Sequence, residues 1–174
     1  MANWSLDSAH SEIEFKVKHM MISTVKGQFN TFNVNVQNDT DQLENAKIDV
    51  EIQTSSINTN NEQRDQHLKS GDFFDVTNHP TITFVSTAIN KTDDDEYKIT
   101  GDLTIRSITK PITLDVEFGG LSKDPWGNQK AGYTVTGKIN RTEFDLNWNA
   151  ALETGGIMVS NDVKFQADIQ FVIS

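Results

Sequence analysis

The sequence contains no cysteine among its 174 residues, so disulfide bonds and thiolate metal sites are excluded. It also contains no apolar run near the ~20 residues that a membrane-spanning helix needs. The first seven residues, MANWSLD, lack both the basic start and the apolar stretch of a secretory signal. If Met1 is the natural start, we therefore expect a cytoplasmic protein.

Positive charge is scarce as well, because 15 Lys and Arg residues stand against 25 Asp and Glu residues, a formal net charge of −10. Affinity for nucleic acids and electrostatic docking on anionic lipid both depend mainly on Lys and Arg, so this balance argues against both. The chain also lacks a nucleophile elbow, a P-loop, a dinucleotide-binding fingerprint and an HExxH zinc motif. Its 36% of hydrophobic residues fits one soluble domain over residues 1–174.

The dominant pattern in the chain is alternation of apolar and polar residues, which is typical of half-buried β-strands. In one segment the apolar positions change parity between Phe29 and Phe32, which predicts a bulge or a bend there. A short strand is also expected near Trp4. The alternating segments are residues 12–18, 25–36, 47–53, 81–89, 97–105, 112–118, 131–139 and 163–173.

Two segments depart from this alternation. Residues 60–70 read as one short polar helix, for which Asn60 or Asn61 is the expected N-cap. Residues 141–145 fit a single helical turn. The acidic run at 93–96 lacks the glycine and the ligand spacing of a calcium loop, so we expect a solvated hairpin tip.

About eight antiparallel strands with one apolar face must close into a barrel or stack as a sandwich. An eight-stranded barrel has an interior that is either just filled or holds one small ligand. Alternation does not distinguish these outcomes. Small residues on the apolar face either favour a cavity or make room for neighbouring phenylalanines; they are Gly101, Ala131, Gly137 and Ala167.

Polar residues with catalytic potential gather in the predicted helix, where Arg64, Asp65 and His67 lie close together. They form either an acid–base cluster or, the reading we favour, the polar face of a helix that packs Leu68 inward. The four histidines include no pair at the i, i+4 spacing of a helical zinc site. The residues alone therefore predict neither a catalytic group nor a metal site.

A series of motifs, in order along nearly the whole chain, resembles the YceI-like family of polyisoprenoid-binding, lipocalin-like bacterial proteins. The most specific are SINT at 56–59, RDQHL at 64–68, DFFD at 72–75 and HPTITF at 79–84. Others are WSLDSAHS at 4–11, IEFKVKHM at 13–20, GDLTI at 101–105, TKP at 109–111, DPWG at 124–127 and RTEF at 141–144. Ser107 and Asp145 stand where the family often has glycine, and the secretion signal of many relatives is missing.

The resemblance implies an eight-stranded antiparallel lipocalin-like barrel, with a short helix covering one side and a long isoprenoid or similar lipid inside. It also implies a homodimer and no established enzymatic reaction. We expect no cofactor apart from a bound lipid, and no nucleic-acid partner. The expected lining of the barrel is Phe15, Val17, Phe29, Phe32, Ile48, Val50, Phe84, Ile99, Leu103, Leu114, Val116, Phe118, Val135, Ile139, Phe165 and Ile169.

The leading hypothesis is therefore a binding protein that carries or sequesters a lipid, with His19, Arg64, His67 and Arg141 as candidate contacts to its head group. A second hypothesis is an enzyme that acts on a bound lipid through polar residues at the barrel mouth. Its candidate residues are His10, His19, Arg64, Asp65 and His67. A third is a structural or stress protein whose barrel is filled.

Overall fold

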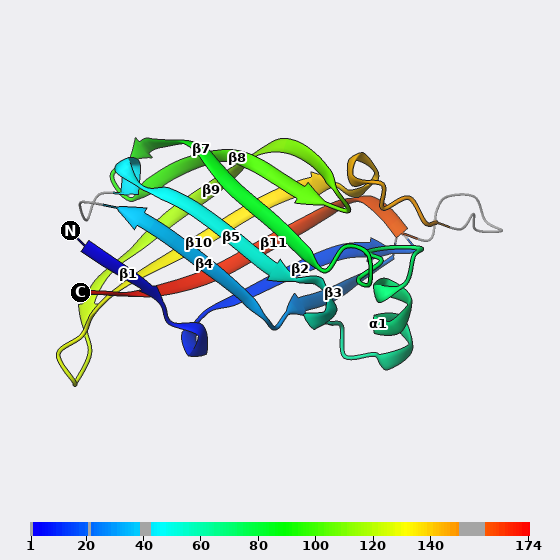
Figure 1. The fold of residues 1–174 in the computed structure, drawn as a ribbon, viewed down its shortest axis with the longest axis horizontal. Coiled ribbons are helices and arrows are strands. Elements are labelled where there is room, and N and C mark those ends of the chain that lie inside the picture. The colour runs from blue at the N-terminus through cyan, green and yellow to red at the C-terminus, as the bar shows by residue number, and fades with distance from the viewer. Residues whose placement is uncertain (1, 21, 39–42, 150–158) are drawn as a thin grey trace.

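The computed structural model describes residues 2–20, 22–38, 43–149 and 159–174, which form a closed antiparallel β-barrel with one short helix (Figure 1). The strands run obliquely across the long axis of the molecule. No helix among the described residues has both the length and the apolar character needed to cross a membrane. The elements are β1 (Ala2–Leu6), β2 (Glu12–His19), β3 (Ser23–Phe29), β4 (Phe32–Asn38), β5 (Lys47–Gln53), β6 (Ile57–Asn58), α1 (Glu62–Lys69), β7 (Thr81–Asp93), β8 (Glu96–Ile105), β9 (Ile108–Lys123), β10 (Gln129–Asn140) and β11 (Val159–Ile173).

Three of the eight barrel strands are broken. β1 and β2 are separated by a 3₁₀ turn at Ser8–His10, and both pair with β11. β4 pairs with β1 and β5, while β3 pairs with β2 and β6, so β3–β4 and β5–β6 each act as one interrupted strand. The parity change predicted between Phe29 and Phe32 is this break in β3–β4. Antiparallel pairing from β5 through β7, β8, β9 and β10 to β11 closes the ring.

The predicted all-β fold is confirmed, because each alternating segment lies within a strand, except that the segment 25–36 is divided between β3 and β4. The polar helix is also confirmed as α1, and Asn61 caps it by accepting a hydrogen bond from the Arg64 backbone N–H at 3.0 Å. The predicted turn at 141–145 is a 3₁₀ helix over Arg141–Phe144. Asp93 and Glu96 face one another at the predicted hairpin tip between β7 and β8.

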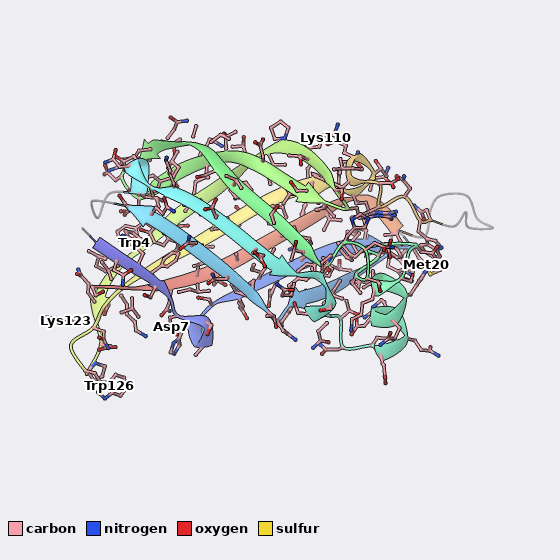
Figure 2. The ribbon with its side chains drawn as sticks, viewed as in Figure 1. Trp4, Asp7, Met20, Lys110, Lys123 and Trp126 are labelled. Carbon is pink, nitrogen blue, oxygen red and sulfur yellow. The ribbon has the colours of Figure 1, made fainter. Side chains whose placement is uncertain are left out.

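The barrel has two distinct ends. The terminus end holds the chain termini and the hairpin between β9 and β10, and the helix end holds α1 and the turn between β2 and β3 (Figures 1 and 2). At the helix end the ladder between β5 and β7 stops at the pair Gln53 and Thr81. Helix α1 and residues 70–80 connect β6 to β7 at this end. The Arg106 side chain holds the second part of this connection by donating to the carbonyls of Gly71 and Phe73, at 3.3 and 2.7 Å.

A candidate ligand cavity inside the barrel

A cavity of about 610 Å³ runs through the barrel interior. This volume lies within the ~300–1,000 Å³ that is usual for small-molecule sites in proteins. The walls are mainly aliphatic and aromatic side chains from the inward faces of the strands. An interior that is solidly packed, as the filled-barrel hypothesis required, is therefore excluded.

The structure places most of the predicted lining residues on the wall of this cavity. Phe32 and Phe118 are the exceptions, since both pack against the core without lining the cavity. Phe118 pairs with Tyr133 beside a register shift, and its ring packs on the Tyr133 ring at 5.2 Å, so Tyr133 takes the place on the wall. Phe32 is the first residue of β4, directly after the strand break. The residues that do line the cavity are Phe15, Val17, Phe29, Ile48, Val50, Phe84, Ile99, Leu103, Leu114, Val116, Val135, Ile139, Phe165 and Ile169.

Sequence reasoning missed two kinds of lining residue. Ile13, Val34 and Ile52 alternate with polar neighbours in strands, so the same period-two signal identifies them. Phe73, Leu146 and Trp148 line the cavity from irregular segments, where no period indicates the direction of a side chain.

The small residues on the inward face accommodate phenylalanine rings. Phe165 and Gly137 are directly paired, and a Cβ on Gly137 would lie 2.7 Å from Phe165 Cε2. Phe15 is likewise paired with Gly27, and the corresponding distance to Phe15 Cε1 would be 2.8 Å. Phe84 covers Gly101 in the same way. These glycines therefore face aromatic rings. At Gly137, the Phe165 ring fills the space that a side chain would otherwise take.

Polar lining side chains gather at the helix end. Tyr133 is the exception at the opposite end of the cavity. No Asp or Glu among the described residues lines the cavity, although the chain carries a net charge of −10. The helix end of the cavity is therefore cationic, and its polar lining is His19, Thr59, Asn61, Gln63, Arg64, His67 and Arg141.

Arg141 is a buried cation that is 3% exposed. Its Nε donates to the Ser160 carbonyl at 2.9 Å, and Nη1 donates to the carbonyls of Leu146 and Trp148, the latter at 3.0 Å. Nη2 donates to the Val159 carbonyl at 3.2 Å. Burial lowers the pKa of the Arg141 guanidinium. Its acceptors are main-chain carbonyls, so its charge is not neutralised by a carboxylate among the described residues.

Arg64, Asp65 and His67, which the sequence groups in α1, have different partners in the structure. Arg64 binds Thr59, with Nε 2.8 Å from Oγ1 and Nη2 2.8 Å from the carbonyl oxygen. Asp65 accepts from the Thr59 backbone N–H at 2.9 Å, so its carboxylate fixes the approach to α1 and does not line the cavity. His10 is hydrogen-bonded to Asp7 outside the cavity. Of the candidate residues of the enzyme hypothesis, His19, Arg64 and His67 therefore line the cavity, whereas His10 and Asp65 do not.

His67 connects α1 to the segment that follows β10. Its Nε2 lies 2.9 Å from Asp72 Oδ2, and its ring packs edge-on against Phe73 and Trp148 at centroid distances of 5.1 and 4.8 Å. No group of three or more His, Asp and Glu side chains among the described residues is arranged to hold a metal ion. His67 thus belongs to an aromatic cluster that covers the helix end.

Comparison with known proteins identifies similar chains over the whole length. A YceI-like domain model matches residues 4–171. A UPF0312 protein of Staphylococcus aureus (strain USA300) is 50% identical, covering 100% of this chain and 99% of that protein. The crystal structure of a Campylobacter jejuni YCEI protein is 35% identical, with a TM-score of 0.77 over 99% of this chain and 98% of that one. A polyisoprenoid binding domain from Saccharophagus degradans shares the fold at 13% identity, with a TM-score of 0.76 over 99% of each chain.

Proposed function

The chain belongs to the YceI-like family, and on that premise we propose that it binds a long-chain isoprenoid or a similar amphiphilic lipid inside its barrel. Its role is to carry or sequester this lipid. The observation that supports the proposal most directly is the shape of the cavity, which is apolar along the barrel and cationic at the helix end. The structural neighbour from Saccharophagus degradans is described as polyisoprenoid binding.

Burial of the lipid tail supplies most of the affinity. Each buried CH₂ contributes ~0.8 kcal/mol, so a five-carbon isoprene unit contributes roughly 3–4 kcal/mol before ordering costs are subtracted. Several units therefore suffice for tight binding without a strong head-group site. The apolar walls of the cavity match this requirement, and none of the described residues that line it is a carboxylate.

The head group of the lipid lies at the helix end in this proposal. His19, Arg64, His67 and Arg141 line the cavity there. Arg141 already uses four of the ~five N–H donors of a guanidinium on main-chain carbonyls, so it contributes mainly charge. An acceptor-bearing head group such as a carbonyl, carboxylate or phosphate is favoured there.

The experiment combines native mass spectrometry and organic extraction of gently purified protein with uptake of a prenyl quinone in solution. We expect recovery of a lipid, saturable uptake, and a loss of uptake of about tenfold in Val135→Phe, which places a ring in the cavity. The matched control is Thr136→Phe, because Thr136 is the next residue of β10 and points outward. Recovery of no lipid together with no uptake of a prenyl quinone or a fatty amide would overturn the proposal.

We also propose that the protein works in the cytoplasm, and that it forms the homodimer that the resemblance to the family implies. Light scattering coupled to size-exclusion chromatography measures the mass of the assembly against 19.5 kDa for one chain. Fractionation of expressing cells measures the compartment. A monomeric mass over the working concentration range would exclude the dimer.

A further inference from the structure

Four lysines stand side by side on the outer wall of the barrel. Lys138 of β10 is paired with Lys164 of β11, and Lys164 is paired with Lys16 of β2. Lys16 is in turn paired with Lys26 of β3. Since neighbouring strands lie ~4.8 Å apart, these four residues form one continuous row of charge, which we call the lysine row.

The lysine row is not explained by stability. Like charges directly opposite one another on neighbouring strands repel, and here three successive pairs do so. Among the described residues, Lys138 has a carboxylate partner, Asp162 at 3.8 Å, whereas Lys16, Lys26 and Lys164 have none. A binding partner that carries negative charge relieves this repulsion.

The wall around the lysine row is polarised along the barrel. Toward the terminus end, Glu12 of β2 is paired with Asp168 of β11, which places two carboxylates together. Toward the helix end, Lys18 follows Lys16 on the same outward face of β2, and Asp162 of β11, which also lies there, is 3.8 Å from Lys138. The field of this wall therefore directs its helix end toward an anionic surface and its terminus end away from it.

Exposed apolar side chains lie in the turn that joins β2 to β3, two of the strands that carry the lysine row. Met20 and Ile22, in the turn from β2 to β3, are 41% and 83% exposed, and we call them the apolar tip. Figure 2 shows Met20 at the helix end of the barrel. His19, the neighbour of Met20, lines the cavity. Cations beside exposed apolar side chains are the combination that binds the interface of a lipid bilayer, whereas a soluble polyanion has no contact to make with the tip.

We propose that the lysine row and the apolar tip form a docking surface for a membrane rich in anionic lipid. Docking brings the cationic end of the cavity to the bilayer, where a lipid enters or leaves the barrel. The net charge of −10 does not prevent this, because screening limits each charge to a Debye length of ~8 Å at physiological salt. The lipid surface therefore responds to the local row and not to the sum over the chain.

The test is co-sedimentation with phosphatidylcholine vesicles and with vesicles that contain one quarter phosphatidylglycerol. We expect binding to the anionic vesicles only, and its loss in 0.5 M salt. The double variant Lys16→Gln, Lys164→Gln is expected to bind about 30-fold more weakly. The matched control, Lys47→Gln with Lys110→Gln, removes the same charge from exposed positions on β5 and β9 and is expected to bind as the parent does.

The apolar tip is tested in the same assay. Ile22→Ser is expected to weaken binding severalfold, whereas Trp126→Ser, which removes an equally exposed apolar side chain at the opposite end, is expected to leave it unchanged (Figure 2). Thermal unfolding of each variant checks folding. Removal of two repelling charges is expected to leave the row variant at least as stable as the parent.

Three outcomes overturn the proposal: equal binding to neutral and anionic vesicles, an equal loss in both double variants, or no vesicle binding. Binding of soluble polyphosphate through the lysine row without vesicle binding would replace the membrane with a soluble polyanion. Because uptake of a prenyl quinone is measured without vesicles, failure of the docking surface is distinguishable from failure of the lipid-binding proposal.

Discussion

At the terminus end, the Trp4 ring packs on Tyr133 and Phe171 at centroid distances of 6.3 and 5.5 Å. At the helix end, Arg141 and Arg64 hold irregular chain segments through hydrogen bonds to carbonyl and hydroxyl oxygens. Apolar packing closes the terminus end, whereas at the helix end hydrogen bonds on short segments act together with the rings of His67, Phe73 and Trp148. Hydrogen bonds that open can be replaced by bonds to water, whereas separated aromatic rings gain no such partner, so we expect the proposed lipid to pass through the helix end.

The largest expected effect is a loss of stability from removing apolar packing at the terminus end. Trp4→Ala removes a side chain that is 6% exposed, and we expect a loss of about 3–5 kcal/mol in the free energy of unfolding. Trp4→Phe is the control, because the indole N–H has no hydrogen-bond partner among the described residues and a ring is retained. Urea denaturation of both variants measures the difference. Equal losses in the two would show that ring packing does not close this end.

The next largest expected effect comes from removing hydrogen bonds at the helix end. Arg141→Met keeps an unbranched apolar chain but removes a donor from four carbonyl groups, of which only that of Val159 still accepts from the Asn149 side chain among the described residues. We therefore expect a loss of about 3 kcal/mol in the free energy of unfolding. Arg141→Lys retains the charge with fewer donors and is expected to lose less. Both are measured by urea denaturation. A loss below about 1 kcal/mol for Arg141→Met would mean that the segments around residues 146–148 hold together without it.

A smaller effect concerns the wall between the two ends. Gly137→Ala forces a Cβ against the Phe165 ring, and we expect a loss of about 1–3 kcal/mol. Gly132→Ala, in the same strand, is the control because nothing lies within 4 Å of the added Cβ. Thermal denaturation of the pair gives the comparison. If Gly137→Ala proved as stable as Gly132→Ala, the ring would not be confined against the wall.

The smallest expected effect concerns the turn between β8 and β9. Arg106 and Ser107 form the turn between β8 and β9 with φ of 51° and 65°, a region that favours glycine. Ser107→Gly is therefore expected to raise the free energy of unfolding by about 0.5–1 kcal/mol. Ser122→Gly, in extended backbone of β9, is expected to lower it instead. Thermal unfolding measures both, and changes of the same sign would contradict this interpretation.

Positive φ also explains both departures of the chain from the pattern of its family. Ser107 and Asp145 have φ of 65° and 62°, so each occupies a left-handed position at which glycine is common. Asp145 is used further, since its carboxylate accepts from the Asn147 side chain at 2.8 Å and lies 3.8 Å from Arg106 Nη2. Both departures lie in local turns of an intact barrel.

The strands, the helix and most of the cavity wall follow from local sequence pattern. Alternation at period two sets the direction of Val135 and Leu103 because a strand turns successive side chains to opposite faces. Phe73, Leu146 and Trp148 escape such reasoning, because their direction depends on segments that Arg106 and Arg141 hold in place. Whether the interior is hollow was equally undecided, because that depends on how opposite walls meet.

By itself the sequence determined an all-β fold, the faces of its strands and a net charge of −10. Only the tertiary structure decided where that charge lies. Residues 16, 26, 138 and 164 are distant along the chain, and the register of four strands places them in one row. Register depends on closing the whole barrel, whereas composition adds charges without regard to distance. A net acidic chain therefore carries a local row of basic side chains, which composition alone does not predict.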